Sequence, residues 1–334
     1  MPDRFPKPLL NIENLKIEFP TRRGTLVAVD DISLAINPGE VLGVVGESGA
    51  GKSLTGMSII GLLEPPGRIA AGRIYLNGRR IDTLPYDTMR QIRGKEIGAI
   101  FQDPLTSLNP LFKVSEQLIE TIRTHLDLSE AQARTRAVEL LKEVGIPSAV
   151  ERIDHYPHQF SGGMRQRVVI ALALCANPRL IIADEPTTAL DVSIQAQIIE
   201  LLKRLCREHE TAVMLITHDM GVIAETADRV AVMYAGRIAE IGSVEDVVLH
   251  AKHPYTHGLM GSIPAIGHDV AKLTQIEGSM PRLTEIPSGC SFNPRCPKAF
   301  DRCGVEQPDL MPVGDSFAAC WLFDERRQEV FAGE

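Results

Sequence analysis

The sequence lacks a hydrophobic run that could cross a lipid bilayer. Its longest uninterrupted apolar segment, Val168 to Ala176, has nine residues, whereas a membrane-spanning helix needs about 20. The amino-terminal residues also lack the apolar core of a secretory signal. We therefore expect a chain that stays in the cytoplasm, where its thiols are reduced.

The sequence also lacks an excess of basic residues. It contains 35 Lys and Arg against 43 Asp and Glu, a formal net charge of -8, with no block of like charge. This balance argues against a surface for nucleic acid or anionic lipid. Aromatic residues are few, at 5%, but an apolar fraction of 44% is too high for a disordered chain. At 334 residues we expect one large domain and a smaller appended one.

Short apolar runs that predict strands alternate with helical patterns. The run Val41 to Val45 suits a strand buried on both faces. The region from Leu105 to Ala176 is mostly helical, and one of its helices begins with a capping box at Ser129 and Gln132. This alternation predicts an α/β fold with a parallel core. Strands are expected at residues 10–19, 27–36, 41–45, 180–183 and 212–216.

A glycine-rich turn connects the buried strand to a helical pattern that runs from Lys52 to Leu63. Residues 46–53, GESGAGKS, match the phosphate-binding pattern G-x-x-x-x-G-K-S/T. The three glycines let backbone N–H groups approach phosphate oxygens, while Lys52 would neutralise the outer phosphates and Ser53 would bind Mg²⁺. The alternative is an ordinary glycine-rich connection with an exposed lysine. The candidate nucleotide-binding residues are Gly46, Glu47, Ser48, Gly49, Ala50, Gly51, Lys52, Ser53 and Leu54.

A second buried strand, at 180–183, ends in two carboxylates, Asp184 and Glu185. Ligands bind at the carboxyl ends of strands in α/β folds, so Asp184 would hold Mg²⁺ and Glu185 would polarise an attacking water. Alone, such residues are usually a solvated strand end. Together with the phosphate-binding turn they predict a site for nucleotide hydrolysis.

Residues 160–167, FSGGMRQR, resemble the signature loop of the ATP-binding cassette (ABC) ATPases, usually LSGGQ, with Phe160 for Leu and Met164 for Gln. A Ser-Gly-Gly turn before a helix could otherwise be a simple N-cap. The sequence also carries FQDP with Gln102, DEPTTALD at 184–191 and LITHD with His218, in the order of that family. The resemblance covers about residues 9–250.

This resemblance implies a RecA-like P-loop core with an antiparallel β subdomain, and a helical subdomain at about 103–176 that carries the signature. Two cassettes would enclose ATP between the turn of one and the signature loop of the other. The resemblance assigns adenine stacking to Phe19, contact with Mg²⁺ or the attacking water to Gln102, and γ-phosphate contact to His218. It also implies that Asp191 lies in the dimer interface. The residues that it implies complete the partner's site are Ser161, Gly162 and Gly163. Without it, Phe19 could be a core residue, Gln102 part of a surface loop and His218 a structural histidine.

Three further segments, YPHQFSGGM, FQDPLTSLNP and HPYTHGLM at 253–260, resemble the dipeptide, oligopeptide and nickel importer subfamily, and here the likeness extends to about residue 322. Ser53 and the segment MSIIGLLEPPGRI are similar to the first of the subfamily's two distinct ATPase subunits. From residue patterns alone, HPYTHGLM could equally be an ordinary amphipathic helix. The resemblance divides the chain into an ATPase domain at 1–262 and an extension at 263–334.

The importer resemblance implies that ATP hydrolysis by this chain powers the uptake of dipeptides or oligopeptides. The implied partners are a sister ABC ATPase, two transmembrane permeases and, through them, an extracytoplasmic peptide-binding protein. The implied location is the cytoplasmic face of the bacterial inner membrane. Nickel or opines are alternative cargoes, and a non-transport ABC ATPase for DNA repair or ribosome work is the alternative class.

Four of the six cysteines, Cys290, Cys296, Cys303 and Cys320, fall near the carboxy terminus, whereas Cys175 and Cys206 lie in helical apolar patterns and are expected to pack. Four close thiols in a reducing compartment suggest a metal site. Their spacing is wider than in zinc knuckles, and an iron-sulfur cluster tolerates it better. The likeness to importer tails favours a 4Fe-4S cluster that pins the tail, with zinc or unligated thiols as alternatives.

Overall fold

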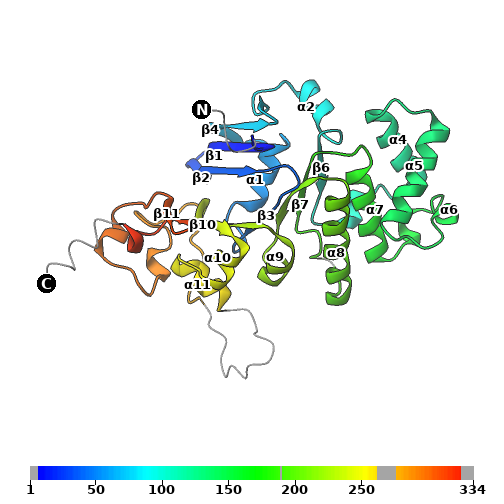
Figure 1. The fold of residues 1–334 in the computed structure, drawn as a ribbon. Helices are drawn as coiled ribbons and strands as arrows, with labels where there is room; N and C mark the ends of the chain where they lie inside the picture. Colours follow the sequence, from blue (N-terminus) through cyan, green and yellow to red (C-terminus); the bar gives the residue numbers. More distant parts are fainter. Residues whose placement is uncertain (1–6, 189, 262–275, 325–334) are drawn as a thin grey trace, which may run out of the picture. The chain divides into compact units, whose positions relative to one another are not determined.

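The computed structural model describes residues 7–188, 190–261 and 276–324. The chain separates into two compact units, and Figure 1 shows the course of each. The first unit comprises Met1–Asn11, Ala35–Val41 and Tyr75–Ile216, and the second unit comprises Ile12–Leu34, Leu42–Ile74 and Thr217–Glu334. Among the described residues, no helix combines the length and the apolar character needed to span a membrane.

The first unit contains three parallel strands in the order β8-β7-β6. Strands β6 (Ile97–Ile100), β7 (Leu180–Asp184) and β8 (Ala212–Ile216) pair in register, with Ile97 opposite Leu180 and Leu180 opposite Ala212. Every residue of β7 and β8 is buried, as expected for strands covered on both faces. The predicted parallel core and both predicted strands are therefore confirmed.

Helices make up most of the rest of the first unit. Helix α5 begins at the predicted capping box, where the Ser129 hydroxyl accepts a bond from the Gln132 N–H and the Gln132 side chain accepts one from the Ser129 N–H. Its apolar stripe packs inward with Ala137, Leu140 and Leu141 buried. The helices are α2 (Tyr86–Ile92), α3 (Pro104–Ser107), α4 (Val114–His125), α5 (Glu130–Glu143), α6 (Ala149–Arg152), α7 (Gly162–Leu174) and α8 (Val192–Glu208).

A separate antiparallel sheet contains β1 (Leu10–Thr21), β2 (Gly24–Ile36) and β4 (Arg68–Leu76), in the order β2-β1-β4. Most residues of these strands belong to the second unit. Alternate residues of β1 are buried, which matches the alternation in the sequence and confirms the paired strands predicted there. The short strand β5 (Arg79–Arg80) pairs with the last two residues of β4.

The second unit also holds five strands in the order β11-β12-β10-β9-β3. Strand β3 (Val41–Val45) runs parallel to β9 (Arg229–Tyr234), and β10 (Arg237–Ser243) follows antiparallel to β9. The helices of this unit are α1 (Lys52–Ile59), α9 (Met220–Thr226), α10 (Val244–Leu249) and α11 (Pro254–Met260).

The carboxy-terminal residues extend that same sheet. Strands β11 (Met311–Val313) and β12 (Ser316–Ala318) form a hairpin, and β12 pairs with β10 so that Glu240 lies opposite Ala318. Strands of three residues carry too little pattern to be predicted from sequence. The predicted boundary between the ATPase domain at 1–262 and the extension at 263–334 lies outside the described residues.

Candidate functional site

The glycine-rich turn follows β3 directly, and its glycines adopt backbone conformations that other residues rarely tolerate. The φ angles are 151° at Gly46, 85° at Gly49 and 99° at Gly51. A Cβ atom at Gly46 would collide with the carbonyl oxygen of Met233 on β9. The turn therefore depends on glycine both for its dihedral angles and for its close approach to β9.

Lys52, the first residue of α1, folds its side chain back over the turn. The residue is 5% exposed, and its Nζ donates to the carbonyl oxygens of Gly46 at 2.8 Å and Glu47 at 3.0 Å. The N-cap residue Gly51 offers no side-chain acceptor to the first N–H groups of the helix. A helix start of this kind, with an ammonium group beside it, suits a phosphate anion. The other predicted turn residues divide into exposed Ser48 and Ser53, half-buried Glu47 and Leu54, and buried Ala50.

In the first unit, β7 ends at Asp184, which is 9% exposed, and Glu185 follows with φ 46°. A left-handed conformation at a non-glycine residue is strained, and such strain often occurs at functional sites. The Glu185 N–H donates to the carbonyl oxygen of Ile216 at 2.8 Å, which fixes the backbone at the strand end.

The Glu185 carboxylate is held by two donors on one oxygen. Gln102 Nε2 donates to Glu185 Oε2 at 3.0 Å, and the Thr188 hydroxyl donates to the same oxygen at 2.7 Å. Gln102 and Glu185 were both predicted as site residues, whereas Thr188 was not. The only sequence signal for Thr188 is its position three residues after Glu185, within reach of a local side-chain bond.

The signature loop lies at the amino end of α7 in the first unit. Ser161 is the N-cap, and its hydroxyl accepts a bond from the Met164 N–H at 3.4 Å. Ser161 and Gly162 are exposed, and Gly163 is half-buried. Phe160 is 3% exposed, which explains why an apolar residue precedes the serine. Asp191 is the exposed N-cap of α8, and its side chain makes no capping bond.

Two further predicted residues belong to the second unit. Phe19 near the end of β1 is half-buried, and a Cβ atom at Gly67 would lie 2.7 Å from its ring. His218 is exposed and precedes Asp219, whose carboxylate caps α9 through the N–H of Gly221 at 2.8 Å. The second unit thus holds the phosphate-binding turn, Phe19 and His218. The predicted site residues of the first unit are Gln102, Ser161, Gly162, Gly163, Asp184, Glu185 and Asp191.

All four carboxy-terminal cysteines are free thiols. Cys290 and Cys296 are half-buried, and Cys303 and Cys320 are each 8% exposed. Burial and, to a lesser degree, the three neighbouring thiols raise the pKa of Cys320 to about 12. The donor chemistry therefore fits a four-cysteine ligand set, because these thiols share one neighbourhood. Their arrangement is not that of an assembled metal site: within the described ranges, no group of three or more His, Cys, Asp or Glu residues is placed to hold a metal ion.

The other two cysteines are buried in helices, as predicted. Cys175 at the end of α7 is fully buried, and Cys206 in α8 is 1% exposed. Burial raises the pKa of Cys206 to about 12, which keeps it a neutral thiol.

Comparisons with known proteins match both halves of the chain. Residues 29–188 match the family model described as ABC transporter, and residues 239–303 match that of the oligopeptide/dipeptide transporter C-terminal region. The oligopeptide transport ATP-binding protein AppD of Bacillus subtilis is 47% identical over 96% of this chain and 98% of its own length. The dipeptide transport ATP-binding protein DppD of Escherichia coli is 45% identical over 92% of this chain and 94% of its own length.

Among solved structures, the dimeric ATP-binding cassette MJ0796 in a post-hydrolysis state bound to ADP and phosphate superimposes with a TM-score of 0.63. It is 30% identical and covers 70% of this chain and 98% of its own. The predicted α/β cassette fold is therefore confirmed.

Proposed function

The chain belongs to the ATP-binding subunits of the oligopeptide and dipeptide ABC transporters, and from this premise we propose how its residues bind and hydrolyse ATP. The phosphate-binding turn is the half of the site that takes the triphosphate. Lys52 Nζ exchanges its bonds to two carbonyl oxygens for bonds to phosphate oxygens. This proposal is supported above all by the burial of the Lys52 side chain directly over the turn.

The carboxylates after β7 supply the hydrolytic half of the site. Ser53 and Asp184, with Gln102, would hold Mg²⁺, which neutralises phosphate charge when bound. Glu185 orients the attacking water and accepts its proton, in an orientation that the Gln102 and Thr188 bonds maintain. His218 contacts the γ-phosphate, and Phe19 stacks on the adenine.

A second cassette completes each site. Ser161, Gly162 and Gly163 begin α7 with exposed backbone and would bind the γ-phosphate of ATP held by the partner. The dimeric state of the related cassette supports this arrangement. The partner would be a sister ABC ATPase, with Asp191 in the interface.

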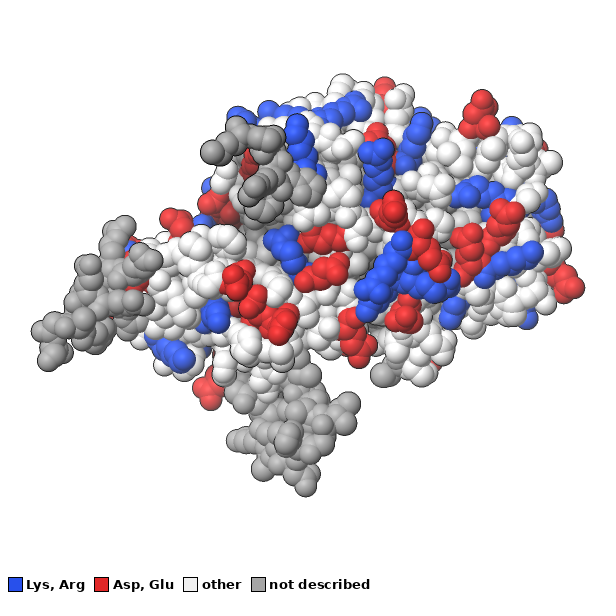
Figure 2. Space-filling view, in the orientation of Figure 1, with Lys and Arg blue, Asp and Glu red and all other residues white. Residues whose placement is uncertain are grey.

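We further propose that this pair of ATPases drives two transmembrane permeases from the cytoplasmic face of the bacterial inner membrane. An extracytoplasmic peptide-binding protein would deliver dipeptides or oligopeptides to those permeases. Nickel or opines are alternative cargoes. A role on nucleic acid receives no support from the face drawn in Figure 2, where basic side chains lie among acidic ones.

For the extension at 263–334, we propose that Cys290, Cys296, Cys303 and Cys320 bind a 4Fe-4S cluster, with zinc or unligated thiols as alternatives. The proposal is supported by four free thiols, three of which lie close enough to Cys320 to raise its pKa. Ligation would release their protons and fix the segment around them.

The test of the proposed function is peptide uptake by cells that express the chain with its sister ATPase and permeases. Replacing Lys52 by Ala should abolish uptake and ATP hydrolysis. Replacing Lys203, a residue of α8 that belongs to none of the motifs, should leave uptake within about twofold. Undiminished uptake by the Lys52→Ala variant would contradict the proposal.

A further inference from the structure

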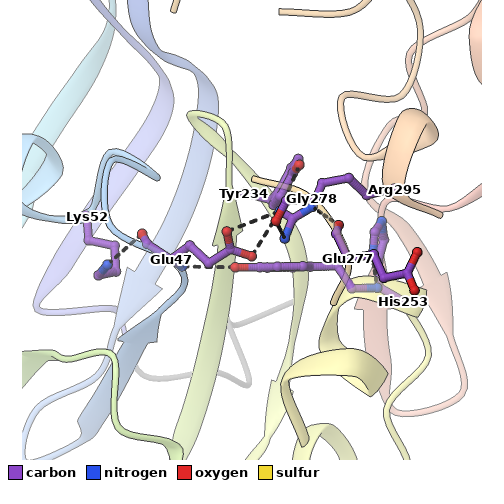
Figure 3. A network of polar contacts seen from close by, with 8 residues as sticks. Glu47, Lys52, Tyr234, His253, Glu277, Gly278 and Arg295 are labelled. Atoms are coloured by element: carbon purple, nitrogen blue, oxygen red, sulfur yellow. Dashed lines mark hydrogen bonds and ion pairs between the residues drawn. The ribbon is translucent and has the colours of Figure 1, made fainter. Parts of the chain in front are cut away.

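Glu47, the second residue of the phosphate-binding turn, is held at three points (Figure 3). Its N–H donates to the Tyr255 hydroxyl at 2.9 Å, and its carbonyl oxygen accepts from Lys52 Nζ at 3.0 Å. Its carboxylate accepts from Arg295 Nη1 at 3.0 and 3.1 Å. One residue therefore links the ATP-binding lysine to two residues of the carboxy-terminal region.

The Arg295 guanidinium is fixed by bonds from several directions. Its side chain is 8% exposed. Besides Glu47, it donates from Nη1 to the Tyr234 hydroxyl at 3.3 Å, from Nε to the carbonyl oxygen of Glu277 at 2.9 Å and from Nη2 to that of Gly278 at 3.4 Å. A buried guanidinium with this many partners holds its acceptor far more rigidly than an exposed ion pair does.

The segment that Arg295 holds also lies against the turn. Met280 follows Glu277 and Gly278, and its Cε would lie 2.9 Å from a Cβ atom at Gly49. Arg295 thus binds Glu47 through its carboxylate and, through the backbone at 277 and 278, secures the residue that packs on Gly49.

The position of the Tyr255 hydroxyl is equally constrained. Tyr255 is fully buried in α11, and its N–H donates to His253 Nδ1 at 3.0 Å. Its ring packs against those of Tyr234 and Phe292, with centroids 4.6 and 5.4 Å apart. Burial raises the pKa of Tyr255, so the hydroxyl stays neutral as the acceptor for the Glu47 N–H.

These contacts bear on binding because glycine-rich turns have many accessible conformations. Ordering such a turn costs conformational entropy, and a turn already held in its bound form avoids that cost when the ligand arrives. We propose that Arg295 and Tyr255 are positioning residues for ATP. Acting through Glu47, they hold the turn in its phosphate-binding form, so that the carboxy-terminal region sets the affinity of the site for Mg-ATP. This inference rests on the proposed function.

The experiment measures Mg-ATP binding by the full-length chain, and KM and kcat of the assembled complex. Arg295→Ala should raise the Kd and the KM for ATP about 5- to 30-fold, with a smaller change in kcat. Tyr255→Phe, which keeps the ring packing and removes only one acceptor, should raise them about 2- to 10-fold. Tyr255→Phe also tests the inference if Arg295→Ala fails to fold.

A double-variant cycle separates positioning from general stability. If Arg295 acts through Glu47, then Arg295→Ala should add no more than about twofold to the KM of a Glu47→Gln protein. Arg302→Ala is the matched control. It removes ion pairs to Glu306 and Asp324 in the same segment without touching the turn, and its KM should stay within about twofold.

Three results would overturn the inference. They are an unchanged KM in both Arg295→Ala and Tyr255→Phe, fully multiplicative effects of Glu47→Gln and Arg295→Ala, or an equal rise in KM for Arg302→Ala. Failure of the proposed function is distinct, because the wild-type complex itself would then neither bind nor hydrolyse ATP.

Discussion

The side-chain amide of Gln102 donates to the carboxylate of Glu185 at 3.0 Å, although 83 positions separate the two residues. The second residue after β6 is thereby joined to the first residue after β7, at the same edge of three parallel strands. The backbone of Glu185 is strained and its carboxylate is fixed by hydrogen bonds, and a carboxylate held in this way is ready to orient a water molecule.

Replacing Glu185 by Gln should lower kcat for ATP hydrolysis by about 10²- to 10⁴-fold, the range for loss of a general base. Binding of Mg-ATP should persist, because the phosphate-binding turn is unchanged. Steady-state hydrolysis and nucleotide binding measured on the same preparation check both statements. Glu200→Gln, at an exposed position of α8, is the control and should retain normal turnover. Near-normal hydrolysis by Glu185→Gln would remove Glu185 from the role of base.

Replacing Thr188 by Val should lower kcat about 10- to 100-fold, because the charged Glu185 carboxylate loses the hydrogen bond that it accepts from the Thr188 hydroxyl. Thr188→Ser keeps the hydroxyl and should stay within about threefold of the unchanged protein. The comparison is made at saturating Mg-ATP, so that differences in ATP affinity do not affect the measured rates. Equal activity of the Val and Ser variants would show that the hydroxyl does not orient the carboxylate.

Stability should fall as the pH is lowered through the range in which His253 titrates. Burial lowers the pKa of His253 from 6.5 to about 4. Between those values the unfolded chain binds a proton that the folded chain excludes, so stability is full above pH 6.5 and declines toward pH 4. The loss from this residue should reach about 3 kcal/mol. About 2 kcal/mol of this loss should occur between pH 7 and pH 5, and urea unfolding at the two pH values measures it.

The matched variant for this pH effect is His253→Asn. Asparagine retains an oxygen acceptor at the N-cap of α11 but does not titrate. The variant should show a shallower decline of stability between pH 7 and pH 5 than the unchanged chain. An identical pH slope in the two proteins would assign the decline to other groups.

If the four cysteines bind a 4Fe-4S cluster as proposed, anaerobically purified protein should contain about four irons per chain and absorb visible light. Changing Cys290, Cys296, Cys303 or Cys320 to Ser should each reduce the iron content. Cys206→Ala should leave it intact, because Cys206 is buried in α8. A colourless protein containing zinc would contradict the iron assignment, and one without metal would contradict any ligation.

Local patterns predicted the parts of this fold that local chemistry determines. The buried run at β3 and the capping box at Ser129 depend on near neighbours in the sequence, and the glycines of the turn are recognisable by their local spacing. Helix α1 ends at Ile59 rather than at the predicted Leu63, because Gly61 adopts φ 62° and terminates it.

Contacts between distant positions were not predictable in the same way. No pattern around Glu47 or Arg295 marks them as partners of one another, because the two residues are 248 positions apart. The segment HPYTHGLM could be identified as a family feature, but only the structure shows that Tyr255 reaches the turn. The family resemblance placed Gln102 among the site residues, but it did not predict the hydrogen bond from Gln102 to Glu185.

The pairing of β12 with β10 has a practical consequence for shortened chains. A chain ending after α11 would expose the backbone donors and acceptors of β10 along one side. Such an unprotected edge invites pairing with other molecules and aggregation. The hairpin of β11 and β12 therefore protects the edge of the sheet. Removing it should lower the solubility of the chain even if every residue proposed to contact ATP is kept.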